Sequence, residues 1–441
     1  MIFRRWSLLA VVSLMLVGCG GNTTAPQPQP DLMAELPKQM LLTSPMRRQP
    51  VPGWTHTVKD LGLPPGTVVR PVGNIGDRGI FLGITGEGWW LLGLDVTNGQ
   101  RLFGPLRLGP AGDATNFNCF VNGPPTVLCV RQGPDPKAPS TAWVVDTSSG
   151  KLTFDGSTEL RVARTLDQPS LEQVGNYAIA TVFDKGIYGV GAHGEMTWFV
   201  PGDGDLPTQF TRKARDIPMS TLAVQGGGGV ADDVVFSVVD GRVVTPSVPH
   251  DVQPAQIVVY PGGFGYEYSP KEDPTLERVA FFDETGKKLG EPALEGKLDN
   301  GALDLPMISG KSSRTVFSLD GRTLLELPPS KPTADARLIG SRYYVATDAA
   351  NRVWQQFDLA TRKAGKTCEG NSLGHEYIAS DGEVAVASGD DTPARGIDLA
   401  TCETLWSIPG PAPNEAKEVW KVNTTLVQRT NDTLFSLVAP R

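Results

Sequence analysis

The body of the chain repeats a short pattern, and this repeat constrains the fold more than any other feature of the sequence. Three copies are clear, at residues 93–103, 144–154 and 396–406. In each copy an apolar run ends at an aspartate, a few polar residues follow, and a returning run ends in an aromatic residue. A fourth copy, at 356–364, is weaker, and the remaining copies are shortened or degenerate. The anchor positions, in chain order, are Asp95, Asp146, His193, Asp240, Asp283, Asp320, Asp358 and Asp398.

Each copy has the composition of a β-hairpin turn. An aspartate carboxylate can accept backbone N–H bonds from the residues that follow it, and glycine adopts the positive φ that such turns require. Gly99 and Gly150 hold that glycine position in two copies, and Cys402 holds it in a third. The closing aromatic residue is expected to pack on the next unit. We therefore interpret the repeated aspartates as structural turn residues, and not as catalytic acids or calcium ligands.

The spacing of the repeat predicts an all-β propeller. Successive anchors are 37 to 51 residues apart, which suits four short antiparallel strands each. Residues 53–58 resemble an outer strand without its own hairpin, and 419–438 resemble strands without an outer partner. Pairing the two ends in one blade would close the ring and remove an open sheet edge. The anchors plus this closure give nine hairpins; we predict eight blades, assuming that one shortened copy is not an independent blade, and seven blades is the alternative.

The repeat resembles the pyrroloquinoline-quinone-like repeat, whose typical motif runs Ala-x-Asp-x-x-Thr-Gly-x-x-x-Trp. The resemblance extends over about residues 54–438 and implies a propeller, often of eight blades. Quinoprotein alcohol and glucose dehydrogenases use this repeat to hold their cofactor, and the alcohol dehydrogenases add adjacent cysteines and a Glu/Asn/Asp calcium set. This chain has no Cys-Cys pair, and no motif marks an acidic trio. We therefore expect no cofactor.

The first 52 residues differ from the repeats. Arg4 and Arg5 precede an apolar run over 6–17, which is shorter than the about 20 residues that span a bilayer. Residues 16–19, Leu-Val-Gly-Cys, resemble the lipobox of bacterial lipoproteins, which implies that residues 1–18 are a signal peptide and that Cys19 is lipidated. An ordinary secretory signal with a chance cysteine is the alternative. Residues 19–52 are predicted to be the lipidated N-terminus and a flexible, Pro-rich tether, and residues 53–441 the propeller.

Four cysteines remain beyond Cys19, and an even number in an exported chain favours two disulfides. Cys119 and Cys129 flank a Gly-Pro-Pro loop, so they are expected to lie opposite each other on paired strands. The pairing of Cys368 with Cys402 follows mainly by elimination. It needs a short outer strand to bring the two Cα atoms within the ~4.4–6.8 Å of a disulfide. Free buried thiols are the alternative.

No motif marks a catalytic or metal site. The four histidines lie in unrelated contexts, at His56, His193, His250 and His375. The net charge of −8 becomes −10 without residues 1–18, which carry two arginines (−8 minus 2), and no basic stripe suggests a nucleic-acid partner. The aromatic clusters at 89–90, 266–268 and 343–344 are expected to pack between blades, with a rim that grips a peptide or sugar as the alternative.

The lipobox, tether and repeats together resemble the BamB-type lipoproteins, propeller components of the β-barrel assembly machinery. This resemblance implies a non-catalytic, monomeric protein-binding scaffold. It would be lipid-anchored on the extracytoplasmic side of the cell or outer membrane and would bind other envelope proteins. Because propellers host many functions, two alternatives stay open. One is a quinone-dependent dehydrogenase or another enzyme with its site in the channel, and the other is a cell-wall carbohydrate-binding module.

Overall fold

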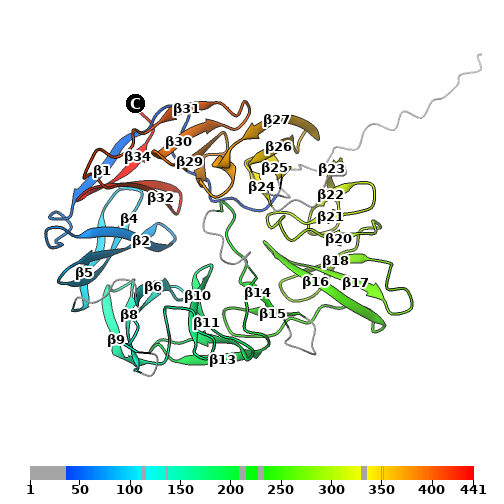
Figure 1. Cartoon of the computed structure of the whole chain (residues 1–441), viewed down its shortest axis with the longest axis horizontal. Coiled ribbons are helices and arrows are strands. Elements are labelled where there is room, and N and C mark those ends of the chain that lie inside the picture. The colour runs from blue at the N-terminus through cyan, green and yellow to red at the C-terminus, as the bar shows by residue number, and fades with distance from the viewer. Residues whose placement is uncertain are drawn as a thin grey trace, which may run out of the picture.

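The computed structural model describes residues 36–110, 116–135, 138–207, 215–226, 233–328, 335–348, 350 and 352–441. Within these residues the strands form nine antiparallel sheets that follow one another around a central axis (Figure 1). We number these sheets as blades 1 to 9 in chain order. In each blade the first strand lies nearest the axis and the last lies at the periphery, except in blade 9, whose peripheral strand comes from the N-terminus.

The bounds of the strands are as follows. Blade 1 comprises β2 (Val68–Ile75), β3 (Arg78–Thr85), β4 (Gly88–Asp95) and β5 (Arg101–Pro110); blade 2, β6 (Phe117–Val121), β7 (Thr126–Arg131), β8 (Ser140–Asp146) and β9 (Lys151–Thr158); blade 3, β10 (Ser170–Val174), β11 (Tyr177–Val182), β12 (Gly186–Val190) and β13 (Met196–Pro201). Blade 4 has β14 (Leu222–Gln225) and β15 (Val234–Ser237); blade 5, β16 (Val252–Tyr260), β17 (Gly263–Pro270), β18 (Arg278–Asp283) and β19 (Lys288–Gly290); blade 6, β20 (Lys297–Leu298), β21 (Met307–Ser309), β22 (Arg314–Phe317) and β23 (Thr323–Leu327). Blade 7 comprises β24 (Ala336–Ile339), β25 (Arg342–Ala346), β26 (Val353–Asp358) and β27 (Lys363–Glu369); blade 8, β28 (Tyr377–Ser380), β29 (Val384–Gly389), β30 (Thr392–Asp398) and β31 (Thr404–Ser407); blade 9, β32 (Lys417–Val422), β33 (Thr425–Thr430), β34 (Thr433–Val438) and β1 (Val51–Thr57). One short 3-10 helix, η4 (Asn371–Leu373), precedes blade 8.

The two ends of the chain close the ring, as predicted. β1 pairs antiparallel with β34, and Pro52 lies opposite Leu437. The Trp54 backbone N–H donates to Ser436 Oγ at 3.2 Å, and its indole N–H donates to Val96 O of blade 1 at 2.8 Å. The closure therefore joins blade 9 to blade 1 as well as completing blade 9.

The repeated aspartates cap the outer hairpin turns, as predicted. Asp95 Oδ1 accepts the Thr97 backbone N–H at 2.9 Å, and Asp146 Oδ1 accepts that of Ser148 at 2.8 Å. The other five make the same kind of bond to a backbone N–H two or three residues ahead: Asp240, Asp283, Asp320, Asp358 and Asp398. Cys402 has a φ of 63° in the place of the turn glycine.

The closing aromatic residue of one blade covers the turn of the next. A Cβ added to Gly99 would lie 2.7 Å from the Trp54 ring, and one added to Gly150 would collide with Phe103. Both glycines also have positive φ, 79° and 66°, so these positions favour glycine on two grounds. Where His193 replaces the aspartate, Phe154 still packs on it, with ring centroids 5.4 Å apart.

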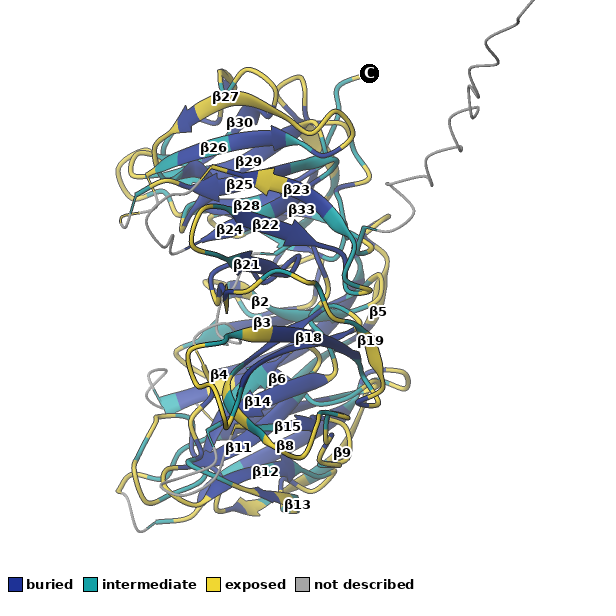
Figure 2. Cartoon of the chain, turned by 90° about the vertical axis from the view of Figure 1, so that its right-hand side faces the viewer, coloured by how far each residue is buried: buried dark blue, intermediate teal, exposed yellow. Residues whose placement is uncertain are grey.

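The hydrophobic cores lie between neighbouring blades, where each sheet buries both faces (Figure 2). Trp89 of blade 1 stacks on Phe117 of blade 2 with ring centroids 4.2 Å apart. The aromatic clusters noted in the sequence are buried: Trp89, Trp90, Tyr266, Tyr268, Tyr343 and Tyr344. They pack between blades, as expected, and do not form a binding rim.

The expected eight four-stranded blades are present, but the count of independent sheets is one higher. Blade 4 is the additional sheet: it has two strands in the described residues, plus an isolated bridge between Phe236 and Val243. It comes from the shortened copy at Asp240. The shortened copy thus forms a separate two-stranded sheet in the described residues, with Phe236 in the core that this sheet shares with blades 3 and 5.

The predicted tether is shorter than residues 19–52. Residues 36–50 lie against blades 7, 8 and 9: Gln39 exchanges two 2.8 Å hydrogen bonds with the Gly340 backbone, and Leu42 N–H donates to Ser380 O. Met46 is fully buried and accepts the Trp406 indole N–H on its carbonyl at 2.6 Å. Blade 9 has no outer hairpin turn because its outer strand is β1, so Met46 covers Trp406 instead.

Cys19 and residues 1–35 lie outside the described residues. No helix among the described residues is long and apolar enough to cross a membrane.

Both predicted disulfides are present. Cys119 and Cys129 lie opposite each other on β6 and β7, with Cα atoms 4.0 Å apart. Cys368 on β27 bridges to Cys402 in the outer turn of blade 8, with Cα atoms 5.2 Å apart. The first bridge staples strands within one blade, and the second joins two blades.

Candidate functional site

A cavity of about 700 Å³ lies at the mouth of the central channel. Its walls come from blades 1, 3, 8 and 9, whose inner strands β2, β10, β28 and β32 face the axis. Asn74 near the end of β2 and the inner hairpin turns with Asn176 and Asn423 contribute amide groups. Because all inner strands run in the same direction, these turns lie on one face of the ring. The N-terminal segment attaches to the same face, and its Met40 lines the cavity.

The floor of the cavity is residues 215–221, which take the place in the chain where an inner strand of blade 4 is expected. This segment runs from the side of the ring formed by blades 6, 8 and 9 across the centre to β14 (Figure 1). The Arg215 guanidinium donates to Asp304 Oδ1 at 2.6 Å and to Leu303 O at 2.9 Å, both in blade 6. Asp304 is held in turn by the Leu338 backbone N–H at 2.9 Å. One end of the crossing segment is thus fixed between blades 6 and 7.

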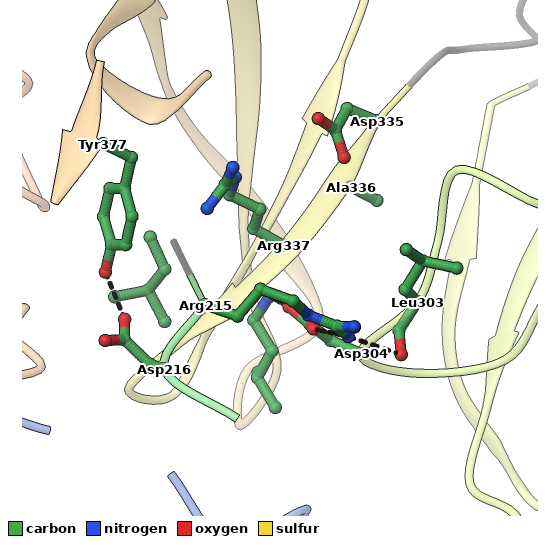
Figure 3. A pocket seen from close by; sticks show the side chains of 10 residues that line it. Arg215, Asp216, Leu303, Asp304, Asp335, Ala336, Arg337 and Tyr377 are labelled. Carbon is green, nitrogen blue, oxygen red and sulfur yellow. Dashed lines mark hydrogen bonds and ion pairs between the residues drawn. The ribbon is translucent and has the colours of Figure 1, made fainter. Parts of the chain in front are cut away.

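The next residue, Asp216, binds blades 8 and 9. Its side chain is 2 % exposed, and its Oδ1 accepts Lys421 Nζ at 2.6 Å. Its Oδ2 accepts the Tyr377 hydroxyl, and Figure 3 shows Asp216 pointing at Tyr377 while Arg215 points toward Asp304 and Leu303. Burial and the neighbouring Asp216 carboxylate raise the pKa of Tyr377 well above its ordinary value. The hydroxyl therefore keeps its proton and donates a hydrogen bond to Asp216.

Two further contacts complete this arrangement. Met40 N–H donates to the Asp216 carbonyl at 2.5 Å, which ties the N-terminal segment to the crossing segment. The Arg337 guanidinium carbon lies 4.9 Å from the centroid of the Tyr377 ring, a cation–π distance. Two consecutive residues of opposite charge thus join the crossing segment to blades 6, 8 and 9.

The described residues that line the cavity include no histidine, no cysteine and no carboxylate. Both of its cationic side chains, Arg215 and Lys421, are already paired with buried carboxylates. A general acid or base must hold a proton at a group that faces the substrate, and Tyr177 is a lining residue whose hydroxyl takes part in no ion pair among the residues described. The lining thus combines paired charges with amide, hydroxyl and apolar groups.

The structure does not bring the residues singled out in the sequence together at this site. The repeated aspartates lie at the periphery, in the outer turns of separate blades. Three of the histidines are exposed at separate positions, and His56 Nε2 contacts Gly99 O at 2.8 Å. Among the described residues no three His, Cys, Asp or Glu side chains form a potential metal site.

Sequence reasoning missed Asp216, Lys421 and Tyr377. No motif marks them, because they lie in three distant parts of the chain and meet only across the channel. One signal was available: residues 203–221 precede a shortened repeat and show no strand pattern where an inner strand was due. The acidic dipeptide at 232–233 and the glycine run at 226–229 fall partly outside the described residues, and Asp390 and Asp391 are exposed in a turn.

The sequence profile of the conjugation-associated 9-bladed β-propeller domain matches residues 27–440. The chain belongs to this family. The nine blades in the name of the family agree with the nine sheets formed by the described residues. The resemblance to the pyrroloquinoline-quinone-like repeat stays a prediction. An uncharacterized protein of Mycolicibacterium smegmatis (strain MKD8) is 39% identical over 433 residues, covering 92% of this chain and 88% of that protein.

Two solved propellers are less similar to this chain in sequence. BamB from Moraxella catarrhalis is 9% identical, with a TM-score of 0.42 over 89% of this chain and 98% of that one. The C-terminal WD40 domain of Sif2 is 10% identical, with a TM-score of 0.38 over 92% of this chain and 99% of that one. At these values neither structure adds to the argument about function.

Proposed function

We propose that this protein is a non-catalytic binding scaffold of the bacterial cell envelope that takes part in conjugation. In this proposal Cys19 carries the lipid anchor, the propeller lies on the extracytoplasmic side of a membrane, and the partners are other envelope proteins. The observation that carries the proposal is the cavity at the channel mouth, whose two cations are committed to internal ion pairs and whose described lining contains no histidine, cysteine or carboxylate.

Three further observations support it. The family is described as conjugation-associated. The two disulfides suit a compartment outside the cytoplasm. The N-terminal segment attaches on the same face as the cavity, so a lipid at Cys19 would tether the molecule from that face.

The test is a donor strain that lacks this gene, complemented with the natural chain or with Cys19→Ala. We expect the deletion to lower the frequency of DNA transfer and the natural chain to restore it. Cys19→Ala should leave the membrane fraction and restore transfer poorly, because the anchor is lost. Unchanged transfer in the deletion strain would contradict a role in conjugation.

The enzymatic alternative has its own measurement. The purified mature chain is mixed with pyrroloquinoline quinone and calcium, and dye-linked oxidation of alcohols and sugars is followed. We expect no turnover above the cofactor alone. Turnover that depends on the protein would overturn the non-catalytic proposal.

A further inference from the structure

The cavity at the channel mouth selects against charged ligands. Arg215 and Lys421 already have their charges compensated by Asp304 and Asp216, so an anion would compete with these buried carboxylates for them. A cation would find no carboxylate among the described lining residues. Charge complementarity therefore favours a neutral ligand.

The walls combine apolar surface with amide groups. Met219, Trp420 and Ile378 are half-buried side chains on different sides of the cavity. Asn176 stands exposed at the tip of an inner turn, and Asn423 donates its Nδ2 to Asp77 Oδ1 at 2.7 Å. Because Asp77 can only accept, the amide orientation of Asn423 is fixed and its Oδ1 has no partner among the described residues. Amides next to apolar side chains match a polypeptide backbone with apolar side chains.

The size of the cavity fits a short segment and not a folded surface. Pockets for compact ligands usually measure roughly 300–1,000 Å³, and this one measures about 700 Å³. A few residues of extended chain fill such a volume. The backbone of an extended segment can bond to amides while alternate side chains enter the pocket.

The N-terminal region of this chain is not the favoured occupant. Toward the N-terminus from Met40, the chain passes Gln39, bonded to Gly340 in blade 7, and reaches Leu36, which packs on the core of blades 6 and 7. It thus leaves on the side of the ring opposite the cavity walls of blades 1 and 3 (Figure 1). A different polypeptide is the better candidate.

We propose that the channel-mouth cavity binds an uncharged, extended segment of a partner protein, with apolar side chains against Met219 and Trp420 and its backbone bonded to the asparagine amides. This inference rests on the proposed function as a binding scaffold and names the chemistry of its partner.

The test selects peptides from a phage-displayed library of random decapeptides on the full mature chain. We expect enriched peptides to be depleted in Asp, Glu, Lys and Arg. Their affinity, measured by fluorescence anisotropy, should fall at least about tenfold in Met219→Asp, a change worth about 1.4 kcal/mol. Asn176→Arg, at an exposed turn, should weaken binding similarly and serves as the second variant if Met219→Asp lowers the melting temperature.

Leu166→Asp is the matched control, because Leu166 is 68% exposed and lies outside the cavity. It introduces the same charge and should leave affinity unchanged. The proposal is overturned if no peptides are enriched, if the enriched peptides are charged, or if they bind the natural chain and both cavity variants equally. Tighter binding of a peptide spanning residues 22–30 than of the selected peptides would also overturn it, in favour of an occupant from this chain.

The same variants separate the two proposals. If Met219→Asp and Asn176→Arg restore DNA transfer fully in the deletion strain while Cys19→Ala does not, the scaffold role stands and the cavity is not its partner site. If the deletion strain transfers DNA normally, the role in conjugation fails irrespective of peptide binding.

Discussion

Blade 1 and blade 4 both pack between two neighbouring blades, but blade 4 does so with fewer and shorter strands in the described residues. Blade 1 has four strands of eight to ten residues. One hydrophobic core joins it to blade 9, and a separate core joins it to blade 2. Blade 4 has two strands of four residues, and one continuous core runs through it from blade 3 into blade 5. A two-stranded sheet can be part of the ring because its side chains pack in a core that includes residues of both neighbouring blades.

The difference also explains the crossing segment. In blade 1 the inner strand β2 lines the channel, whereas residues 215–221, which precede blade 4, run across it (Figure 1). The omitted strand is thus replaced by a brace fixed in blades 6, 8 and 9. The irregular segment at residues 215–221 therefore forms one wall of the cavity.

The largest expected loss of stability comes from a substitution in the core that blades 3, 4 and 5 share. Phe236 in blade 4 and Phe81 in blade 1 are both fully buried. Phe→Ala in a core costs about 3–5 kcal/mol, and we expect Phe236→Ala to lie near about 5 kcal/mol because its core joins three blades. Phe81→Ala, in a core of two blades, should cost about 3 kcal/mol. Urea denaturation of the two variants measures this difference.

The opposite order would break the comparison. If Phe236→Ala costs less than Phe81→Ala, the thin blade collapses into the cavity that the substitution leaves. Hydrogen exchange separates the cases: a shared core predicts faster exchange in blades 3, 4 and 5 together, and local collapse predicts little change.

The next effect concerns the brace. Asp216→Ala leaves Lys421 without its buried partner, and breaking one side of such a pair costs about 3–5 kcal/mol. We expect a loss of about 4 kcal/mol in the free energy of unfolding. The double variant Asp216→Leu with Lys421→Met should recover most of it, because no charge is then left buried. A loss below about 1 kcal/mol in the single variant, typical of an exposed pair, would show that the brace does not hold the ring.

The regular part of this comparison was predictable from sequence, and the irregular part was not. Asp95, Asp146 and their counterparts mark the turns because a local hydrogen bond requires a specific side chain there. Ring closure followed from Trp54 lying on a strand without a hairpin. Asp216 carries no such mark, since its partners Tyr377 and Lys421 are more than 160 residues away in sequence. Contacts across a channel leave no local pattern.

Packing of the N-terminal segment escaped prediction for a related reason. The Pro-rich, polar composition of residues 22–30 suggests a solvated tether for the whole region, although residues 36–50 include five apolar side chains, Leu36, Met40, Leu41, Leu42 and Met46. Only the missing outer turn of blade 9 creates a place for Met46 beside Trp406. The Cys19 anchor, by contrast, depends on a local motif and stays a prediction.

A smaller effect concerns the covalent bridges, which blade 4 lacks. The Cys368–Cys402 bridge closes a longer loop than Cys119–Cys129, with sequence separations of 34 and 10. On the loop-entropy estimate their removal costs about 4 and about 3 kcal/mol. The variants are Cys368→Ala with Cys402→Gly, which suits the positive φ at 402, and Cys119→Ala with Cys129→Ala. Equal losses, measured by urea denaturation, would mean that loop length does not decide the contribution of either bridge.

The smallest effect compares the turn aspartates of the two blades as pH falls. The Thr97 hydroxyl and backbone N–H hold the pKa of Asp95 below its ordinary value, and the Ser237 hydroxyl and Arg242 backbone N–H do the same for Asp240. A carboxyl group whose pKa is lower in the folded chain stabilises the fold above its unfolded pKa of about 3.9. That contribution is lost as the pH falls through the folded-state pKa. We therefore expect the melting temperature to drop between about pH 4 and pH 2, and to drop slightly less in Asp95→Asn and in Asp240→Asn, which keep an oxygen acceptor but no longer titrate. If Asp240→Asn reduces the pH dependence of the melting temperature and Asp95→Asn does not, blade 4 depends on its turn carboxylate more than blade 1 does. A melting temperature of the natural chain that does not change with pH in this range would contradict a stabilising role for the turn carboxylates in either blade.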